Sequence, residues 1–445
     1  MQRQQEYVLR TVEERGVRLV RLWFTDVVGQ LKSFAITPAE LENAFAEGMH
    51  FDGSSIDGFS RVQESDVLAR PDPNTFELLP WTVSENGENS ARMFCDIETH
   101  DGTPFAGDPR YVLRRNVERA LDAGFTFMVA PEMEFFYFRD GDPSHAPQPL
   151  DQGGYFDLTM ADVTSDLRRR TISMLEALGI PVEYSFHEDS PSQHEIDLRY
   201  TNALEMADNV MTFRLLVREI ALERGVYATF MPKPLPGVQG SGMHTHMSLF
   251  RGDENVFHDP ESGGLSVIGQ QFVAGLLHHA REFTAVTNQL VNSYKRLLVG
   301  SEAPPYVTWA YNNRSALVRV PVTKRNKPSS TRIEFRAPDP ACNPYLAFSV
   351  MLAAGLKGIE EGYELAPEAA SNLYELSPAE CAKLGVVPLP GSLADALEEM
   401  ERSDLVLETL GDHIFEWFLR NKRAEWDAYR AQVTPYELAR YLPSW

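Results

Sequence analysis

The sequence has few cysteines and no long apolar run. Its three cysteines, Cys95, Cys342 and Cys381, are odd in number and far apart. They therefore form neither a disulfide framework nor a zinc cluster, and we expect ordinary buried thiols. No apolar run approaches the ~20 residues that a membrane-spanning helix needs. Because the N-terminal residues are polar and read as a helix start rather than a signal peptide, we expect a soluble cytoplasmic protein without a membrane partner.

Positive charge is also scarce. Lysine and arginine total 41 against 64 aspartates and glutamates, which gives a formal net charge of −23. A broad nucleic-acid-binding face needs the opposite balance, so we expect no nucleic-acid partner. The excess acid belongs either to a solvated surface or to carboxylates gathered around divalent metals, and composition does not choose between them.

The rhythm of the chain changes near Gly107. Before it, the sequence is mostly β, with strands expected over 17–24, 31–36, 76–81 and 91–97, a helix over 4–15, and a capping box at 37–40. After it, helices are expected over 109–123, 161–178, 203–224, 268–290, 345–361, 393–403 and 413–429, with strands over 125–130, 182–186 and 226–231. We therefore predict an N-terminal domain over 1–106 and a C-terminal domain over 107–445, without the glycine fingerprint of a Rossmann unit.

The first acidic pair, Glu132 and Glu134, follows the strand expected over 125–130. If that strand continues, residues two apart share a face and both carboxylates project together. Two like charges so close are costly unless a cation lies between them. The alternative is an exposed strand end with solvated acids.

Three further clusters favour the metal interpretation. Glu188 and Glu195 follow the strand expected over 182–186, a flexible Gly-Ser-Gly turn at 240–242 precedes His244 and His246, and Glu334 alternates with Arg332 and Arg336. Oxygen-rich ligands with a single imidazole suit magnesium or manganese better than zinc. Four such motifs, each at the end of a β run, predict one divalent metal site.

Arginine is concentrated in the same part of the chain. Arg296, Arg314, Arg319, Arg332 and Arg336 lie within about forty residues of one another. A guanidinium group can donate two parallel hydrogen bonds to the oxygens of one carboxylate or phosphate. An acidic metal site beside such a cluster fits phosphoryl transfer, although some of these arginines could instead neutralise surface acids.

Together these motifs resemble those of a known family. The residues 51–56, the Glu132/Glu134 pair, and the segments 240–246, 292–296, 302–304, 313–315 and 343–345 occur in the order expected of type I glutamine synthetases. The resemblance covers essentially the whole chain. It implies an α+β fold, with a small N-terminal β-grasp domain and a large C-terminal domain whose curved antiparallel sheet is flanked by helices. It also implies a homododecamer of two hexameric rings with active sites between neighbouring subunits.

The resemblance also implies roles for single residues. Glu134, Glu188 and Glu195 look like ligands of the metal nearer the substrate carboxylate, and Glu132, His244 and Glu334 like ligands of the metal that bridges ATP phosphates. His246, Ser248 and Arg332 resemble nucleotide-site residues. Arg296, Arg314 and Arg336 resemble the arginines that hold substrate carboxylates and the transferred phosphoryl group. Gly240 matches the glutamate-binding loop, Asp52, Ser55 and Tyr155 match the ammonium site, and Glu302 matches the flap over the glutamate entrance.

The implied chemistry explains these residue types. The attacking γ-carboxylate and the ATP γ-phosphate are both anions, so at least two Mg²⁺ or Mn²⁺ ions and several arginines must offset their repulsion. The acyl phosphate would hydrolyse in open water, so a flap must exclude solvent. Ammonium is no nucleophile until a carboxylate such as Asp52 takes a proton from it.

Some positions depart from the family pattern. Gln239 stands where the family usually has asparagine, which could shift substrate affinity or identity. The long insertion of the adenylylated subclass is absent, which favours the shorter subclass regulated by feedback, and Arg61 matches the arginine implicated there in glutamine inhibition. The surroundings of Tyr374 nevertheless resemble the adenylylation loop, so modification of Tyr374 stays open beside the interpretation of an ordinary exposed tyrosine.

Three functions are therefore compared. The leading one is synthesis of glutamine from glutamate, ammonia and ATP. The second is a γ-glutamyl ligase for polyamines or other amines on the same scaffold, kept open by Gln239 and opposed by the intact ammonium-site residues. The third is a catalytically silent homologue, opposed by the presence of all six expected metal ligands.

Overall fold

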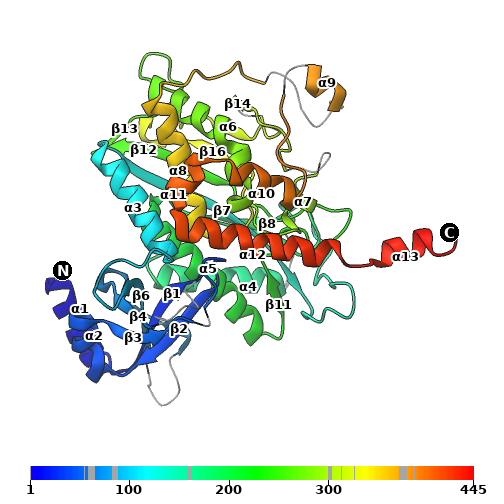
Figure 1. Ribbon diagram of the computed structural model, residues 1–445. Coiled ribbons are helices and arrows are strands. Elements are labelled where there is room, and N and C mark those ends of the chain that lie inside the picture. Colours follow the sequence, from blue (N-terminus) through cyan, green and yellow to red (C-terminus); the bar gives the residue numbers. More distant parts are fainter. Residues whose placement is uncertain are drawn as a thin grey trace.

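The computed structural model describes residues 2–54, 56–58, 66–82, 89–158, 163–298, 303–311, 313–324, 326–369, 378–383 and 386–445. Ser55, Arg61, Glu302 and Tyr374 lie outside these residues. A small β domain formed by the N-terminal part of the chain packs below a larger α+β domain (Figure 1). The fold class expected from the family resemblance is confirmed.

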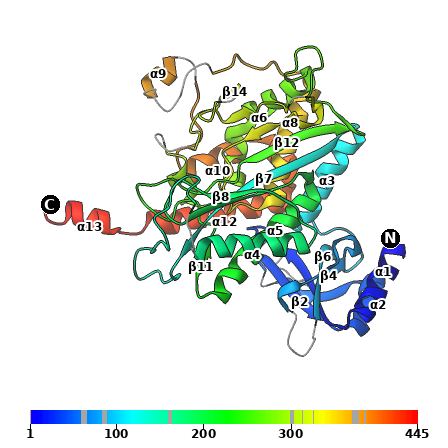
Figure 2. The same ribbon diagram turned by 180° about the vertical axis from the view of Figure 1, so that it is seen from behind.

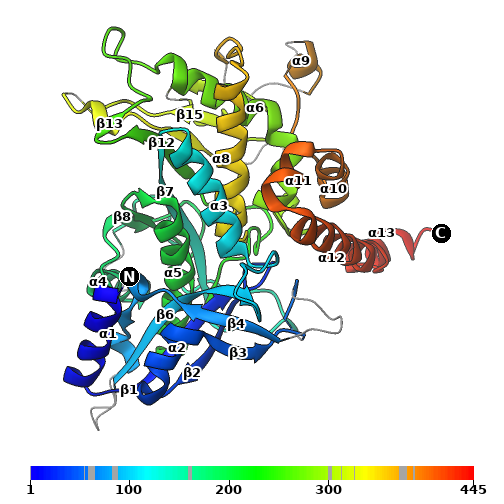
Figure 3. The ribbon, with the colours of Figure 1, turned by 60° about the vertical axis from the view of Figure 1, so that its left-hand side comes forward.

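The N-terminal domain is a β-grasp. Its elements are α1 (Gln2–Glu14), β1 (Val17–Thr25), β2 (Leu31–Ile36), α2 (Leu41–Glu47), β3 (Met49–Asp52), β4 (Asp66–Pro71), β5 (Glu77–Leu78) and β6 (Asn89–Thr99). The strands follow the order β2-β1-β6-β4-β3, with β5 paired to β6. β1 runs parallel to β6, whereas the other pairs are antiparallel. Helices α1 and α2 lie along one face of this sheet (Figure 3), over a separate apolar core.

Two local predictions in this domain are wrong. No capping box forms at 37–40: the Thr37 side chain makes no cap bond, because a 3-10 turn at Pro38–Glu40 uses the Thr37 carbonyl, which accepts from the Glu40 amide at 3.0 Å. The strand expected over 76–81 shrinks to Glu77–Leu78, because a second 3-10 turn occupies Pro80–Thr82. In both places proline at the start of the turn fixes a helical φ and removes an amide donor.

The C-terminal domain is built on a long sheet. Its strands are β7 (Thr126–Phe138), β8 (Val182–His187), β9 (Gln193–Leu198), β10 (Thr201–Asn202), β11 (Tyr227–Thr229), β12 (Thr245–Arg251), β13 (Glu254–Asn255), β14 (Trp309–Tyr311), β15 (Val318–Val320) and β16 (Ile333–Phe335). The order is β14-β15-β16-β12-β7-β9-β8, with β10 and β11 on β7 and β13 on β12. All pairs are antiparallel except β14 with β15.

Helices α3 (Pro109–Asp122), α5 (Ala203–Glu223), α6 (Val267–Thr287) and α8 (Pro344–Glu360) share a core with this sheet and cover one of its faces. The other helices of the domain are α4 (Val163–Ala177), α7 (Ser293–Arg296), α9 (Pro378–Lys383), α10 (Leu393–Glu401), α11 (Asp404–Leu410), α12 (Asp412–Arg430) and α13 (Pro435–Tyr441). Seen from behind, β7 and β12 cross in front of α6 and α8 (Figure 2). Along β7, Phe127, Val129, Met133 and Phe135 are fully buried in the core that these helices share, so the alternate residues face away from the helices.

The last helix projects from the domain. α12 crosses the molecule, and α13 continues beyond it to the C-terminus (Figure 1). Apolar side chains remain exposed along this end, with Leu442 76% and Trp445 98% accessible. Among the described helices, none combines the length and apolarity needed to cross a bilayer.

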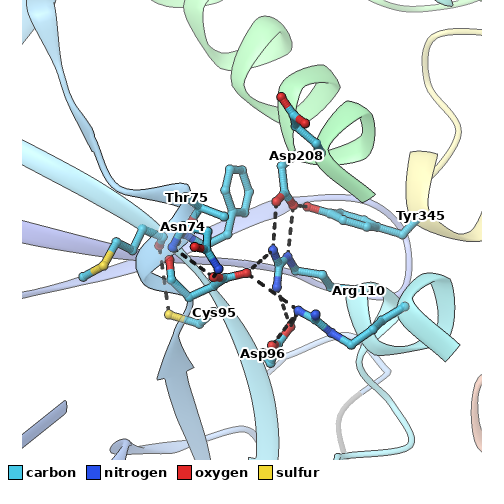
Figure 4. A network of polar contacts seen from close by, with 12 residues as sticks. Asn74, Thr75, Cys95, Asp96, Arg110, Asp208 and Tyr345 are labelled. Carbon is cyan, nitrogen blue, oxygen red and sulfur yellow. Dashed lines mark hydrogen bonds and ion pairs between the residues drawn. The ribbon is translucent and has the colours of Figure 1, made fainter. Parts of the chain in front are cut away.

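A buried ion network joins the two domains (Figure 4). Arg110 of α3 donates two hydrogen bonds to Asp208 of α5, at 3.1 and 2.9 Å, and forms ion pairs with Asp72 and Asp96 of the N-terminal domain. The Tyr345 hydroxyl donates to Asp208 Oδ1 at 2.6 Å. The Arg110 side chain is only 3% exposed. One guanidinium therefore binds carboxylates from both domains and fixes their relative placement.

Candidate active site

The two acids of the first pair lie on the open face of the sheet. β7 continues through Phe138, so Glu132 and Glu134 are strand residues on the same face, as the alternation predicted. The antiparallel partner β9 places Glu195 opposite Glu134 and Asp197 opposite Glu132. Because directly opposed side chains are about 5 Å apart, four carboxylates gather on two adjacent strands.

Both histidines of the 240–246 segment reach Glu132. His244 lies just before β12, and its Nδ1 is 3.0 Å from Glu132 Oε2; His246, on β12, has its Nε2 2.7 Å from Glu132 Oε1. The backbone pairs as well, since the Glu132 amide donates to the His244 carbonyl at 2.9 Å. Each carboxylate oxygen of Glu132 therefore meets one imidazole.

Glu334 completes this group from β16. Its side chain is fully buried and forms ion pairs with Arg319 and Arg336. His244 Nδ1 lies 3.8 Å from Glu334 Oε1 and also 3.8 Å from Glu134 Oε1. His244 thus stands between carboxylates of both expected metal sites, and ligand atoms of Glu132, His246 and Glu334 lie within 4.8 Å of one another.

The other expected acids come from β8, β9 and the turn between them. Glu188 directly follows β8, and Glu195 lies on β9, 96% buried. Between them Gln193 donates from Nε2 to Glu134 Oε2 at 3.0 Å and to the Gly240 carbonyl at 3.1 Å. Gln193 thereby joins the carboxylates to the segment that resembles the glutamate-binding loop.

The electrostatics of the group favour a bound cation. Burial, with the charge of Glu188, raises the pKa of Glu134 well above its usual range. Burial and the charge of Asp197 do the same for Glu195. Burial and the nearby Arg336 lower the pKa of His244 to about 4, which keeps its imidazole neutral. Carboxylates that repel one another beside a neutral imidazole form a donor set that suits a divalent metal.

Arginines line the cavity above these acids. The cavity measures about 300 Å³ and is lined by Arg296, Arg314, Arg319, Arg336, Tyr155, Gln239, Gly240 and the acids Glu132, Glu134, Glu188, Glu195 and Asp197. Arg296 is 97% buried and is held by the carbonyls of Ala337 and Pro338, at 2.6 and 3.2 Å. Arg314 forms a side-chain hydrogen bond with Tyr155. Cationic and anionic groups thus meet across one small space.

Gly240 has a steric reason to be glycine. A Cβ built on it would lie 2.3 Å from the Pro232 carbonyl oxygen. The Gln239 carbonyl beside it accepts from Ser190 Oγ at 3.0 Å. The segment is therefore pressed against its neighbours, and only glycine permits the approach.

A second cavity of about 390 Å³ opens next to the first. It contains His246, Ser248 and Arg332, the three residues expected at a nucleotide site. Arg332 Nε donates to His246 Nδ1 at 3.3 Å. Glu132, Tyr184 and Asp197 line both cavities. Two compartments that share an acidic wall could hold two substrates whose reacting ends meet at that wall.

Asp52 is the expected residue that the structure keeps apart. It ends β3 in the N-terminal domain, is exposed, and accepts a hydrogen bond from the Ser54 amide at 2.8 Å. It lines neither cavity. Ser55, Arg61 and Glu302 lie outside the described residues, so the structure adds nothing to their assignments.

Sequence reasoning missed Asp197 and Gln193. Both lie on β9 at two-residue steps from Glu195, and Asp197 Oδ1 is buried without a hydrogen-bond partner among the described residues. Burial raises the pKa of Asp197 to about 7. The alternation of polar residues at 193, 195 and 197 is the signal that could have identified them.

Comparison with known proteins gives a consistent result. Residues 106–441 match the family described as glutamine synthetase, catalytic domain, and residues 16–100 match glutamine synthetase, beta-Grasp domain. A glutamine synthetase of Mycolicibacterium smegmatis is 58% identical over 444 residues, 99% of this chain and 100% of the relative. One of Thermotoga maritima is 48% identical over 98% of this chain and 99% of the relative. A solved GmaS/ADP complex superposes with a TM-score of 0.88 at 30% identity, covering 98% of this chain and 99% of that one.

Proposed function

We infer the function from one premise: the chain belongs to the glutamine synthetase family and is an enzyme of that family. We propose that it joins ammonia to L-glutamate through a γ-glutamyl phosphate, with release of ADP and phosphate. The observation that carries this proposal is the acidic wall of Glu132 and Asp197 between two cavities, one rich in arginine and the other containing His246, Ser248 and Arg332. Glutamate and ATP would meet there end to end.

The residues fit divalent metals. We propose that Glu134, Glu188 and Glu195 hold one Mg²⁺ or Mn²⁺ ion and that Glu132, His244 and Glu334 hold a second. When bound, such ions neutralise phosphate charge and polarise the transferred phosphoryl group. The carboxylates supply the negative charge that retains the cations, and Gln193 fixes the orientation of Glu134 through its 3.0 Å hydrogen bond.

The arginines provide the remaining positive charge. We propose that Arg296, Arg314 and Arg336 bind the carboxylates of glutamate and the phosphoryl group during transfer, because their guanidinium groups line the same cavity. The carbonyl bonds of Arg296 hold its fork in place before substrate arrives. The Gly240 segment would bind the glutamate backbone at the rim, and a flap carrying Glu302 would exclude water.

The ammonium site needs a second copy of the chain. Tyr155 lines the cavity, whereas Asp52 is exposed and lies outside it. We propose that Asp52 and Ser55 of a neighbouring subunit complete the site, within a dodecamer of two hexameric rings. The exposed apolar end around α13 supports association of this kind, since Trp445 is 98% accessible in the single chain. We also propose that the enzyme works in the cytoplasm, where ATP and glutamate are available, and that Arg61 mediates feedback inhibition.

The second candidate is a ligase that joins glutamate to a polyamine or other amine. Gln239, which lines the cavity, is the residue that favours it. The 58% identity to a glutamine synthetase, against 30% and 32% to GmaS structures, favours ammonia.

The deciding experiment measures ATP-dependent phosphate release with glutamate and a panel of ammonia, putrescine, spermidine and ethylamine. We expect the highest kcat/KM with ammonia. A higher kcat/KM for putrescine or spermidine would replace the first proposal by the second, and no release with any of them would reject both.

A further inference from the structure

A buried polar cluster is centred on Asp151, four residues before Tyr155 in the chain. It lies outside the groups assigned above. Asp151 Oδ1 accepts three hydrogen bonds: from the Ser192 amide at 2.8 Å, from His187 Nε2 at 2.9 Å and from the Gly153 amide at 3.1 Å. Its Oδ2 accepts from Thr164 Oγ1 at 3.2 Å. The Asp151 side chain is 10% exposed and that of His187 is fully buried. A carboxylate with four donors, three of them from other segments of the chain, is a structural junction.

A metal ion does not suit this cluster, although Asp151, His187 and His194 have ligand atoms within 4.8 Å of one another. Arg168 Nη1 lies 2.6 Å from His194 Nδ1. Because a guanidinium only donates, Nδ1 must accept, and the ring proton lies on Nε2, the atom that faces Asp151 Oδ2 at 3.8 Å. A protonated Nε2 cannot bind a cation. The His187 ring is likewise occupied, since its Nδ1 faces the Glu188 carbonyl at 2.6 Å and its Nε2 faces Asp151.

The cluster connects the Tyr155 segment to the metal-site turn. The His187 carbonyl accepts from the Phe156 amide at 3.0 Å, and Gly153 lies so close to the His187 ring that a Cβ would be 2.7 Å from Nε2. In the other direction, Ser192 Oγ accepts from the Asp151 amide at 2.8 Å. His187 precedes Glu188, and Ser192 lies between Glu188 and Glu195. The bonds to His187 and Ser192 therefore tie the Tyr155 segment to the strand ends that carry two expected ligands.

The backbone on both sides is held in an unfavourable conformation. Phe156 has φ 62° and Ser192 has φ 57°, in the left-handed region that non-glycine residues rarely adopt. Such residues persist only where the surroundings fix them. Phe156 is bonded to His187 and Ser192 is bonded twice to Asp151, so the junction supplies that restraint on each side.

We propose that Asp151 is a positioning residue that sets Tyr155 against Arg314 and the carboxylates, and thereby shapes the pocket for the incoming amine. The proposal rests on the function proposed above, because it assigns Tyr155 to the acceptor side of the site. Asp151 touches no substrate; it acts through His187 and Ser192. Loss of the junction should weaken acceptor binding and leave the nucleotide cavity intact, since none of the junction residues lines that cavity.

The test compares Asp151→Ala with Asp151→Asn and with Asp142→Ala as the matched control. Asp142 lies on the same connection, is exposed, and caps the Ser144 amide at 2.8 Å without contact to the site. We expect Asp151→Ala to raise the KM for ammonia about tenfold or more while the KM for ATP changes less than about twofold. Asp151→Asn keeps Oδ1 as the acceptor for the two backbone amides but loses the negative charge opposite His187 and the Oδ2 that accepts from Thr164, so its rise should be about threefold. Asp142→Ala should match the unaltered enzyme.

Amide hydrogen exchange gives a second readout that does not depend on turnover. Residues 151–157 should exchange faster in Asp151→Ala than in Asp151→Asn or Asp142→Ala. An unchanged KM for ammonia in Asp151→Ala, equal effects of Asp151→Ala and Asp151→Asn, or a divalent metal lost only from Asp151 variants would overturn the proposal. If the unaltered enzyme itself makes no use of ammonia, the proposed function fails, and the exchange measurement still decides whether Asp151 holds the segment.

Discussion

His244 Nδ1 lies 3.0 Å from Glu132 Oε2, although 112 residues separate them in the chain. The contact arises because β12 pairs with β7, so that the strand ends carrying the two residues meet. Since the same Glu132 also meets His246, at 2.7 Å, it is the carboxylate with the most contacts to imidazole in the described site.

We predict that Glu132→Gln and His244→Ala each lower the rate of ATP-dependent turnover about 100-fold or more. Each variant removes one of the proposed ligands of the metal. Circular dichroism should show an unchanged fold, and binding of Mn²⁺ should weaken. Glu176→Gln, at an exposed glutamate of α4, is the control. Full activity of either site variant at saturating magnesium would contradict the metal assignment.

The raised carboxyl pKa values predict a pH dependence of stability without metal. The pKa of Asp197 rises from 3.8 to about 7 because burial disfavours its charged form. A group of this kind stabilises the fold fully below its unfolded-state pKa and loses that contribution as the pH rises through the folded-state pKa. The melting temperature of metal-free protein should therefore fall as the pH rises from 3.8 towards about 7, in addition to the effects of all other groups.

Saturating magnesium should reverse this loss, and the rise in melting temperature that it causes should grow with pH. Asp197→Asn should flatten the metal-free profile, and sodium chloride at equal ionic strength is the control for screening. A magnesium effect that is independent of pH would show that these carboxyl groups are already charged in the metal-free protein.

The buried network at the domain junction should contribute strongly to stability. Arg110→Met leaves the carboxylates of Asp208 and Asp96 without their buried partner, and we expect a loss of about 3–5 kcal/mol in the free energy of unfolding. Arg119→Met removes a comparable ion pair with Glu360 whose side chains are 44% and 43% exposed, so it should cost less than about 1 kcal/mol. Urea unfolding followed by fluorescence measures both. Equal losses would mean that Arg110 contributes no more than a surface pair.

The position of Asp52 predicts complementation between subunits. Asp52→Ala and Glu334→Ala should each be inactive. Oligomers reassembled from a mixture should regain part of the activity, because some sites then combine an unaltered Asp52 from one chain with an unaltered Glu334 from another. Mixed oligomers that remain inactive, with mixing verified by native mass spectrometry, would place the whole site within one subunit or reject the role of Asp52.

The sequence by itself determined the local elements and the types of residue that carry the chemistry. Periodicity predicted that Glu132 and Glu134 share a strand face, and β7 confirms it because side chains alternate along any strand. It also predicted most helices to within a few residues, since their ends are marked by glycine or by capping side chains. The prediction from sequence was wrong where two local signals compete. At Thr37 a 3-10 turn that begins with Pro38 forms in place of the capping box.

Only the tertiary structure decided which of those residues meet. Strand order is a long-range property, so no local pattern could show that His244 contacts Glu132, or that Asp197 stands opposite it. The same holds for the Asp151 junction, because three of its four donors come from other segments, up to 41 residues from Asp151 in the chain. Asp52 illustrates both kinds of information. Its residue type could be read from the sequence, whereas its position outside the cavity follows from the packing of a whole domain.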